Sequence, residues 1–267
     1  MSKPQSPIVD FEQWRQSELG QYVQRFEQTC FDKMVADVFG YHALQLGQPN
    51  LDLLRANRMP FKAYAGAELP ALPAADWAGM VLAEPEFLPF DSQSVDLLVL
   101  PHGLEASTHP HQVLREVERV LVPEGRVVIS GFNPWSLWGV RHRTPYLAPW
   151  LPRPIQAQVS LPRLKDWLKL LSFEIELGHF GCYVPPLRSQ KWLDRFAFAE
   201  AAGNRWWPVC GAVYVVSAVK RVAGMRLITP RWKSAAPLRK GARQTAGATL
   251  QQKTGSKPHN ESVTYEF

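Results

Sequence analysis

The stretch that decides the fold class is residues 84–131, EPEFLPFDSQSVDLLVLPHGLEASTHPHQVLREVERVLVPEGRVVISG. Its apolar periodicity predicts a buried strand over 95–100 and an amphipathic helix over 109–121. A turn at 123–125 then leads into a second buried strand over 126–131. Near-continuous apolar strands that alternate with helices are typical of a parallel sheet covered on both faces.

The chain on both sides of this stretch continues the alternation. Residues 8–39 carry apolar side chains at spacings of three and four, which predicts helix with a bend at Gly20. The other predicted strands are 42–46, 61–65, 79–83, 173–180 and 211–219, and the other predicted helices are 51–56, capped by Asn50, 160–171 and 190–202. These elements together predict an α/β fold.

Composition narrows the class of protein. A chain of 267 residues with 46% hydrophobic content is long enough to bury a core without metal or disulfide staples. The three cysteines form no ligand cluster, which argues against a zinc site or a disulfide framework. The polar start and the lack of a long apolar run predict a cytoplasmic protein with no membrane span.

The net charge of +6 is unevenly distributed along the chain. Residues 220–267 hold ten Lys or Arg against two Glu, a charge of +8, so the rest of the chain sums to −2. We therefore predict a helical extension over 1–40, a main domain over 41–224 and a basic, disordered tail over 225–267. A solvated tail is the commoner state for such a sequence; contact with nucleic acid through counterion release is the alternative.

The linked motifs of the central stretch resemble the class I S-adenosylmethionine-dependent methyltransferases, in particular the branch of quinone-biosynthesis methyltransferases. The matching segments are Glu84, Leu-Pro-Phe at 88–90, Val-Asp at 95–96, Glu-Arg-Val-Leu at 118–121 and Pro-Glu-Gly at 123–125. The resemblance implies a Rossmann-like sheet of seven strands, mostly parallel, with an antiparallel last strand. It further implies transfer of a methyl group from S-adenosyl-L-methionine to a small or apolar acceptor, without a metal.

The resemblance also indicates which residues form the site, because ligands of such sheets bind outside the carboxyl ends of the strands. Glu84 aligns with the residue that reads the adenine amine in the family. His102 is the candidate catalytic base, since a free imidazole titrates near neutral pH. The predicted cofactor-binding residues are Gln45, Gly47, Gln48, Glu84, Phe87, Pro101, His102 and Gly103.

The chain departs from the family at the glycine-rich turn after the first strand. The family has an acidic residue followed by Gly-x-Gly-x-Gly, whereas this chain has Gln45, then Gly47, Pro49 and Leu51. No acidic counterpart for the ribose hydroxyls is found near 64–66. The alternative function is therefore a catalytically inactive, methyltransferase-like binding or regulatory protein.

Two further interpretations concern regions outside the central stretch. The resemblance makes the aromatic segment 132–150 a candidate substrate lid, whose tryptophans could line an apolar pocket, and packing against the amino-terminal helices is the alternative. A methyltransferase acting on nucleic acid, recruited by the tail, is a third functional reading. Asn-Pro-Trp at 133–135 only partly matches the motif of amino-methylating relatives. The sequence does not predict the oligomeric state.

Overall fold

The computed structural model describes residues 11–70, 74–143, 158–185 and 207–222, together with Glu200, Gly203 and Arg205. Residues Met1–Gly224 form one compact unit, so the amino-terminal helices belong to the same body as the sheet. The basic tail predicted at 225–267 lies outside the described residues, as does all but Glu200 of the helix predicted at 190–202.

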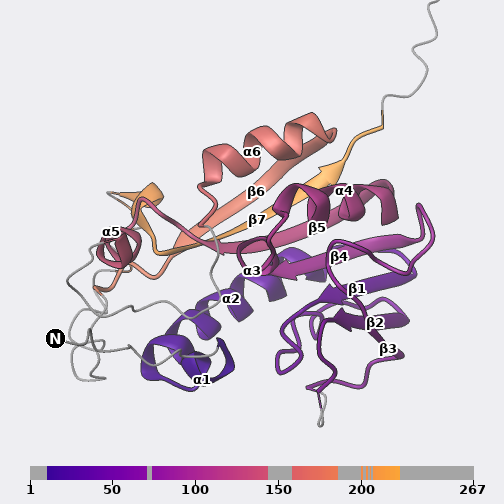
Figure 1. Cartoon of the computed structure of the whole chain (residues 1–267), viewed down its shortest axis with the longest axis horizontal. Helices are drawn as coiled ribbons and strands as arrows, with labels where there is room; N and C mark the ends of the chain where they lie inside the picture. Colours follow the sequence, from indigo (N-terminus) through magenta and orange to yellow (C-terminus); the bar gives the residue numbers. More distant parts are fainter. Residues whose placement is uncertain are drawn as a thin grey trace, which may run out of the picture. The chain divides into compact units, whose positions relative to one another are not determined.

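The centre of the fold is a sheet with the strand order β3-β2-β1-β4-β5-β7-β6 (Figure 1). Of its seven strands, β7 alone runs antiparallel to its neighbours, as the sequence predicted. The strands are β1 His42–Leu46, β2 Phe61–Gly66, β3 Gly79–Leu82, β4 Val95–Pro101, β5 Leu121–Phe132, β6 Phe173–Gly181 and β7 Val213–Lys220.

Helices cover both faces of this sheet (Figure 1). On one face, α4 buries its apolar side beside α6, against strands β1, β4 and β5. On the other face, α2 packs Phe31, Met34 and Val35 against β1, β4, β5 and β7. The helices are α1 Phe11–Arg15, α2 Glu18–Ala36, α3 Gly103–Ala106, α4 Pro110–Val120, α5 Leu137–Arg143 and α6 Leu161–Leu170, with a 3₁₀ turn at Pro208–Cys210. Within the described residues, none of these helices is long and apolar enough to cross a membrane.

The amino-terminal helix breaks at Ser17 rather than at Gly20. The Ser17 hydroxyl donates to the carbonyl of Trp14 and accepts from the amide of Gly20, at 2.5 and 3.1 Å. Ser17 is thus the N-cap of α2, a role that hydroxyl side chains favour. Gly20 serves the close approach of the two helices, because a Cβ there would collide with the backbone of Trp14 and Arg15.

The short helix predicted at 51–56 is wrong: this segment forms turns. The side chain of Gln45 binds two of its backbone groups: it donates to the carbonyl of Leu51 and accepts from the amide of Leu53. The amide of Leu54 donates to the Asp52 carboxylate. Polar side chains that bind the local backbone compete with helix formation, and in this segment their hydrogen bonds replace those of a helix.

Of the tryptophans of the aromatic segment, Trp138 packs against the amino-terminal helices, as the alternative interpretation expects. Trp138 of α5 is buried, donates from Nε1 to the carbonyl of Val184 at 2.8 Å, and shares a core with Trp14, Leu19 and Val23 of the amino-terminal helices. Trp135 is exposed. Tyr146 and Trp150 lie outside the described residues.

Candidate functional site

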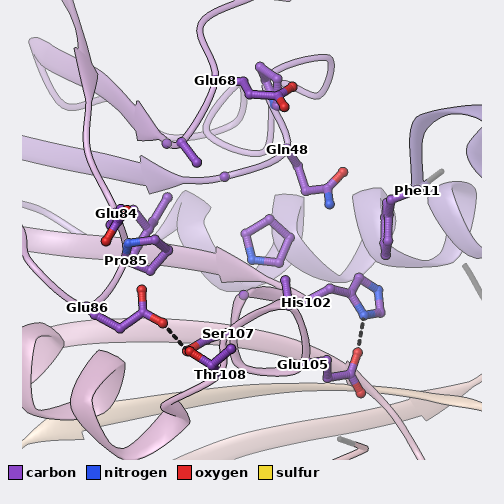
Figure 2. A pocket seen from close by; sticks show the side chains of 18 of the residues that line it. Phe11, Gln48, Glu68, Glu84, Pro85, Glu86, His102, Glu105, Ser107 and Thr108 are labelled. Atoms are coloured by element: carbon purple, nitrogen blue, oxygen red, sulfur yellow. Dashed lines mark hydrogen bonds and ion pairs between the residues drawn. The ribbon is translucent and has the colours of Figure 1, made fainter. Parts of the chain in front are cut away.

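A cavity of about 660 Å³ opens at the carboxyl ends of β1, β2 and β4 (Figure 2). The chain reaches β2 on one side of β1 and β4 on the other, so this is the topological switch point of the sheet, where open α/β folds bind ligands. Its size suits a small molecule, and its lining is mostly apolar. Phe11 and His102 lie at one side of the cavity, and Glu84, Pro85 and Glu86 lie at the opposite side.

The turn after β1 gives the cavity an open edge. Gly47 has a φ of 82°, and a Cβ added there would meet no atom within 4 Å. Its amide donates to the carbonyl of Ala65 at 2.8 Å, which fixes the turn against β2. Gln48 continues the left-handed course with a φ of 58°, a conformation that is strained for a side chain of this type. Both residues line the cavity, as predicted.

Gln45 is the predicted contact that the structure places elsewhere. Its side chain is fully buried and is not among the groups that line the cavity. The amide nitrogen donates to the carbonyls of Gln48 and Leu51 at 2.9 and 2.8 Å, and Oε1 accepts from the amide of Leu53 at 3.0 Å. A carboxylate could not donate these bonds, so the Gln in place of the family's acidic residue shapes the turn around Gly47 from behind.

Carboxylates stand on the rim of the cavity. Glu84, predicted from the sequence, follows β3 and is exposed there. Glu68, which the sequence argument missed, follows β2 by two residues, and its carbonyl accepts from the Tyr64 hydroxyl at 2.9 Å. Glu86 accepts from the Ser107 hydroxyl at 2.5 Å and ties the loop after β3 to the loop before α4. A search for acids a few residues beyond 64–66 would have found Glu68.

The remaining predicted residues also lie on the cavity wall. Phe87 is 69% exposed, which leaves its ring available to a ligand. Pro101 ends β4, and Gly103 begins α3 in close packing with Leu100. These positions bring the loop after β3 and the end of β4 to the same cavity, as the sequence predicted for a parallel sheet.

His102 lies at the cavity wall, and its ring is held between two carboxylates. Nδ1 lies 2.8 Å from Glu105 Oε2 and Nε2 lies 2.8 Å from Glu27 Oε1, while the residue is 2% exposed. The contact of Nε2 with Glu27 is an ion pair only, because its geometry does not meet that of a hydrogen bond. Burial by itself lowers the pKa of His102, but Glu27 and Glu105 outweigh it and raise the pKa to about 9. The imidazole is therefore protonated near neutral pH and has no free lone pair with which to act as a base.

Glu27 of α2 is the second residue that the sequence argument missed. Its carboxylate is fully buried, accepts from the Ser130 hydroxyl at 2.6 Å and faces Arg15 at 3.4 Å. Burial raises the pKa of Glu27, but His102, Arg15 and Ser130 outweigh it and lower the pKa to about 2. The signal was present, because Glu27 lies four residues after Val23 and three before Cys30, on the apolar stripe of the helix.

Comparison with known proteins agrees with this geometry. Residues 59–129 match a family model described as a methyltransferase domain. The match runs from just before β2 into β5, and this part of the chain is similar to a methyltransferase domain. Solved structures that share this fold include proteins described as S-adenosylmethionine-dependent methyltransferases.

Two relatives match parts of this chain. The uncharacterized protein YafS of Escherichia coli is 37% identical over 138 residues, 52% of this chain and 55% of YafS. The mitochondrial 2-methoxy-6-polyprenyl-1,4-benzoquinol methylase of Caenorhabditis elegans is 41% identical over 59 residues, 22% of this chain and 20% of the methylase. The chain therefore spans about half the length of the first relative and about a fifth of the second.

The fold also recurs among solved structures. A chain of the complex between the Haloferax volcanii Trm112 methyltransferase activator and the putative methyltransferase superposes with a TM-score of 0.56. The alignment covers 82% of this chain and 100% of that chain, at 14% sequence identity. An S-adenosylmethionine-dependent methyltransferase from Archaeoglobus fulgidus gives a TM-score of 0.53 at 16% identity, covering 79% of this chain and 98% of that one. At this identity the likeness concerns the fold.

Proposed function

We propose that this chain transfers a methyl group from S-adenosyl-L-methionine to a small or apolar acceptor held in the cavity beside Gly47. The observation that carries the proposal is a cavity at the switch point of a methyltransferase sheet whose glycine edge is open and whose rim carries carboxylates. Fold alone does not fix function, so the proposal depends on the residues of this site.

The residues of the cavity fit the cofactor in three respects. Gly47 leaves room for a ligand to approach the backbone, because the space that a side chain would occupy at this position holds no protein atom within 4 Å of the Cβ. Both Glu68 and Glu84 line the cavity, so in this proposal Glu68 accepts hydrogen bonds from ribose hydroxyls and Glu84 accepts one from an adenine amine. Phe87 offers an exposed aromatic face to the base.

The cofactor supplies an electrophilic methyl group on a sulfonium, so the chain mainly has to orient two reactants and exclude water. The apolar wall that includes Phe11, Leu46 and Pro101 suits an acceptor of low polarity. His102 contributes as a fixed, charged part of that wall and takes no proton, because both ring nitrogens face carboxylates. The described part of the chain holds no cluster of metal ligands, and the proposed transfer uses none.

Calorimetric titration with S-adenosylmethionine and S-adenosylhomocysteine tests the proposal. The wild-type protein should bind both. Glu84→Ala and Glu68→Ala should each weaken binding by about 1–3 kcal/mol, the usual effect of losing a hydrogen bond to a ligand in a partly buried site. Glu174→Ala, on the far edge of the sheet in β6, is the matched control and should bind as the wild type does.

The alternative, a binding or regulatory protein without transferase activity, is favoured by one observation. Pro49 and Leu51 stand at positions where the family has glycine, and Pro49 has no backbone N–H, so this turn offers fewer backbone donors than the family's turn. Heat of binding at micromolar cofactor supports the enzyme, and incubation with labelled S-adenosylmethionine and an extract of small molecules then tests transfer. No heat and no fluorescence change at millimolar cofactor would establish the alternative in its place.

A further inference from the structure

We propose that Glu27 of α2 is a positioning residue of the ligand cavity: it holds the His102 side chain, and with it the turn at the end of β4, in the arrangement that shapes the cavity wall. The role for ligand binding rests on the proposed function, whereas the clamp itself does not.

The first argument is the geometry of the turn at His102. This residue has a φ of 53°, a left-handed conformation that residues with a side chain disfavour. Its amide donates to the carbonyl of Ser130 at 3.1 Å, and its ring contacts Glu105 and Glu27 through opposite nitrogens. Glu105 in turn accepts from the amide of Phe132 at 2.7 Å. The surroundings therefore hold the turn in a conformation that His102 by itself disfavours.

The second argument is that the same carboxylate connects the amino-terminal helices to the wall. Glu27 faces Arg15 of α1, and the Arg15 guanidinium lies 5.1 Å from the centroid of the Phe11 ring. Phe11 lines the cavity, with its ring centroid 5.3 Å from that of His102 (Figure 2). One buried carboxylate thus links α1, α2 and the end of β4 at the wall.

The third argument is charge. The charged groups that face each other here are Arg15 of α1, Glu27 of α2, His102 after β4 and Glu105 of α3, beside the Ser130 hydroxyl of β5. All four side chains are buried. Burial raises the pKa of Glu105 and lowers that of Arg15, so Glu27 and His102 are the pair whose charged forms the surroundings favour. Removing one charge from such a set leaves another buried without its partner, which is strongly unfavourable. The arrangement of the cavity wall at His102 should therefore depend on the charge of the Glu27 side chain as well as on its shape.

The first experiment needs no ligand and no variant. In nitrogen-15-labelled wild-type protein, both His102 ring nitrogens should carry protons at pH 7.5 and lose one with a midpoint near 9. The backbone amide resonances of His102 and Gly103 should shift with the same midpoint. A neutral His102 at pH 7.5, or amides that do not follow its titration, overturns the proposal whether or not the protein binds cofactor.

The second experiment compares Glu27→Gln with Asp32→Asn. The first variant keeps the shape and removes the charge; the second removes a carboxylate of the same helix that pairs with Arg55 at 2.5 Å, away from the cavity. In Glu27→Gln the midpoint of His102 should fall by about one unit or more, and the resonances of Phe11, His102 and Gly103 should move. In Asp32→Asn they should stay in place.

The ligand arm is read by calorimetry with S-adenosylhomocysteine. Glu27→Gln should bind about tenfold more weakly, which is about 1.4 kcal/mol, with Asp32→Asn unchanged. If the charge of His102 responds but affinity does not, the positioning role is overturned. If the wild type does not bind at all, the proposed function fails, and the resonances of Phe11, His102 and Gly103 alone decide whether Glu27 positions the wall. If Glu27→Gln does not fold, the wild-type titration decides in the same way.

Discussion

An imidazole between two buried carboxylates has different chemistry from an imidazole on a loop. The carboxylates of Glu27 and Glu105 keep the proton on His102, so this residue can hold a wall and present charge but cannot accept a proton from a substrate. The proton is retained because its loss would leave buried carboxylates without a cation, which costs more than burying the charges as a pair. The chemistry of the residue is thus set by neighbours that come from two other elements, α2 and α3.

This cluster predicts how stability depends on pH. The pKa of His102 is raised to about 9 from 6.5, so its contribution to stability is complete below about pH 6.5 and is lost as the pH rises through 9. The pKa of Glu27 is lowered to about 2 from 4.5, so its contribution is present above 4.5 and is lost as the pH falls towards 2. Thermal unfolding of the wild type should therefore show a melting temperature that declines between pH 7 and 9.5. In Glu27→Gln this decline should be smaller; an equal decline in both proteins would contradict the assignment.

Gly47→Val is the sharpest test of the glycine edge. The side chain would enter open space, so it meets no atom of the chain, but it would occupy volume that a ligand needs. The positive φ adds strain of about 1–2 kcal/mol. We expect a folded protein by circular dichroism, a slightly lower melting temperature and loss of cofactor binding in calorimetry. Undiminished binding would mean that the ligand does not pass this edge.

At the scale of elements, the connection between β1 and β2 decides how the site is framed. At 51–56, where a helix was predicted, the chain forms a turn whose backbone is bound by Gln45. This face of the sheet is covered instead by α2 together with apolar side chains of that turn, such as Leu53 and Leu54. The helix that precedes the sheet in sequence therefore takes part in the core. For this reason α2 can deliver Glu27 to the end of β4.

The two tryptophans near α5 should differ sharply when replaced. Trp138→Ala removes a large side chain from a core and leaves the carbonyl of Val184 without its donor, which should cost about 3–5 kcal/mol of unfolding free energy. Trp135 is 70% exposed, and Trp135→Ala should change stability by less than about 0.5 kcal/mol. Urea denaturation followed by circular dichroism measures both. Similar costs for the two variants would contradict the packing of Trp138.

At the scale of the whole molecule, the compact unit ends at Gly224, close to where the sequence turns basic and poor in large apolar residues. We predict that deletion of residues 226–267 leaves the melting temperature of the rest unchanged, because the segment has too few apolar side chains to bury. Differential scanning calorimetry of the full chain and the truncated chain checks this. A drop of several degrees on truncation would show that the segment packs on the body.

The sequence by itself determined the parallel strands and seven of the residues that line the cavity, and the family resemblance added the antiparallel last strand. These features follow from local signals: runs of apolar residues, glycine and proline at turns, and linked motifs from Glu84 to the turn at 123–125. In a parallel sheet, the carboxyl ends of strands meet at one edge, so naming the residues after each strand already named Gly47, Glu84 and Pro101 as neighbours.

Tertiary structure alone decided which side chains face the ligand and which face the protein. Gln45 turned inward because an amide can satisfy both carbonyls and an amide hydrogen of the turn, and His102 became a paired cation because α2 carries Glu27 to its ring. Such partners are far apart in the chain and are brought together only by the packing of helices on a sheet. The pKa of a buried group depends on those partners, and so the protonation of His102 could not be read from its own place in the sequence.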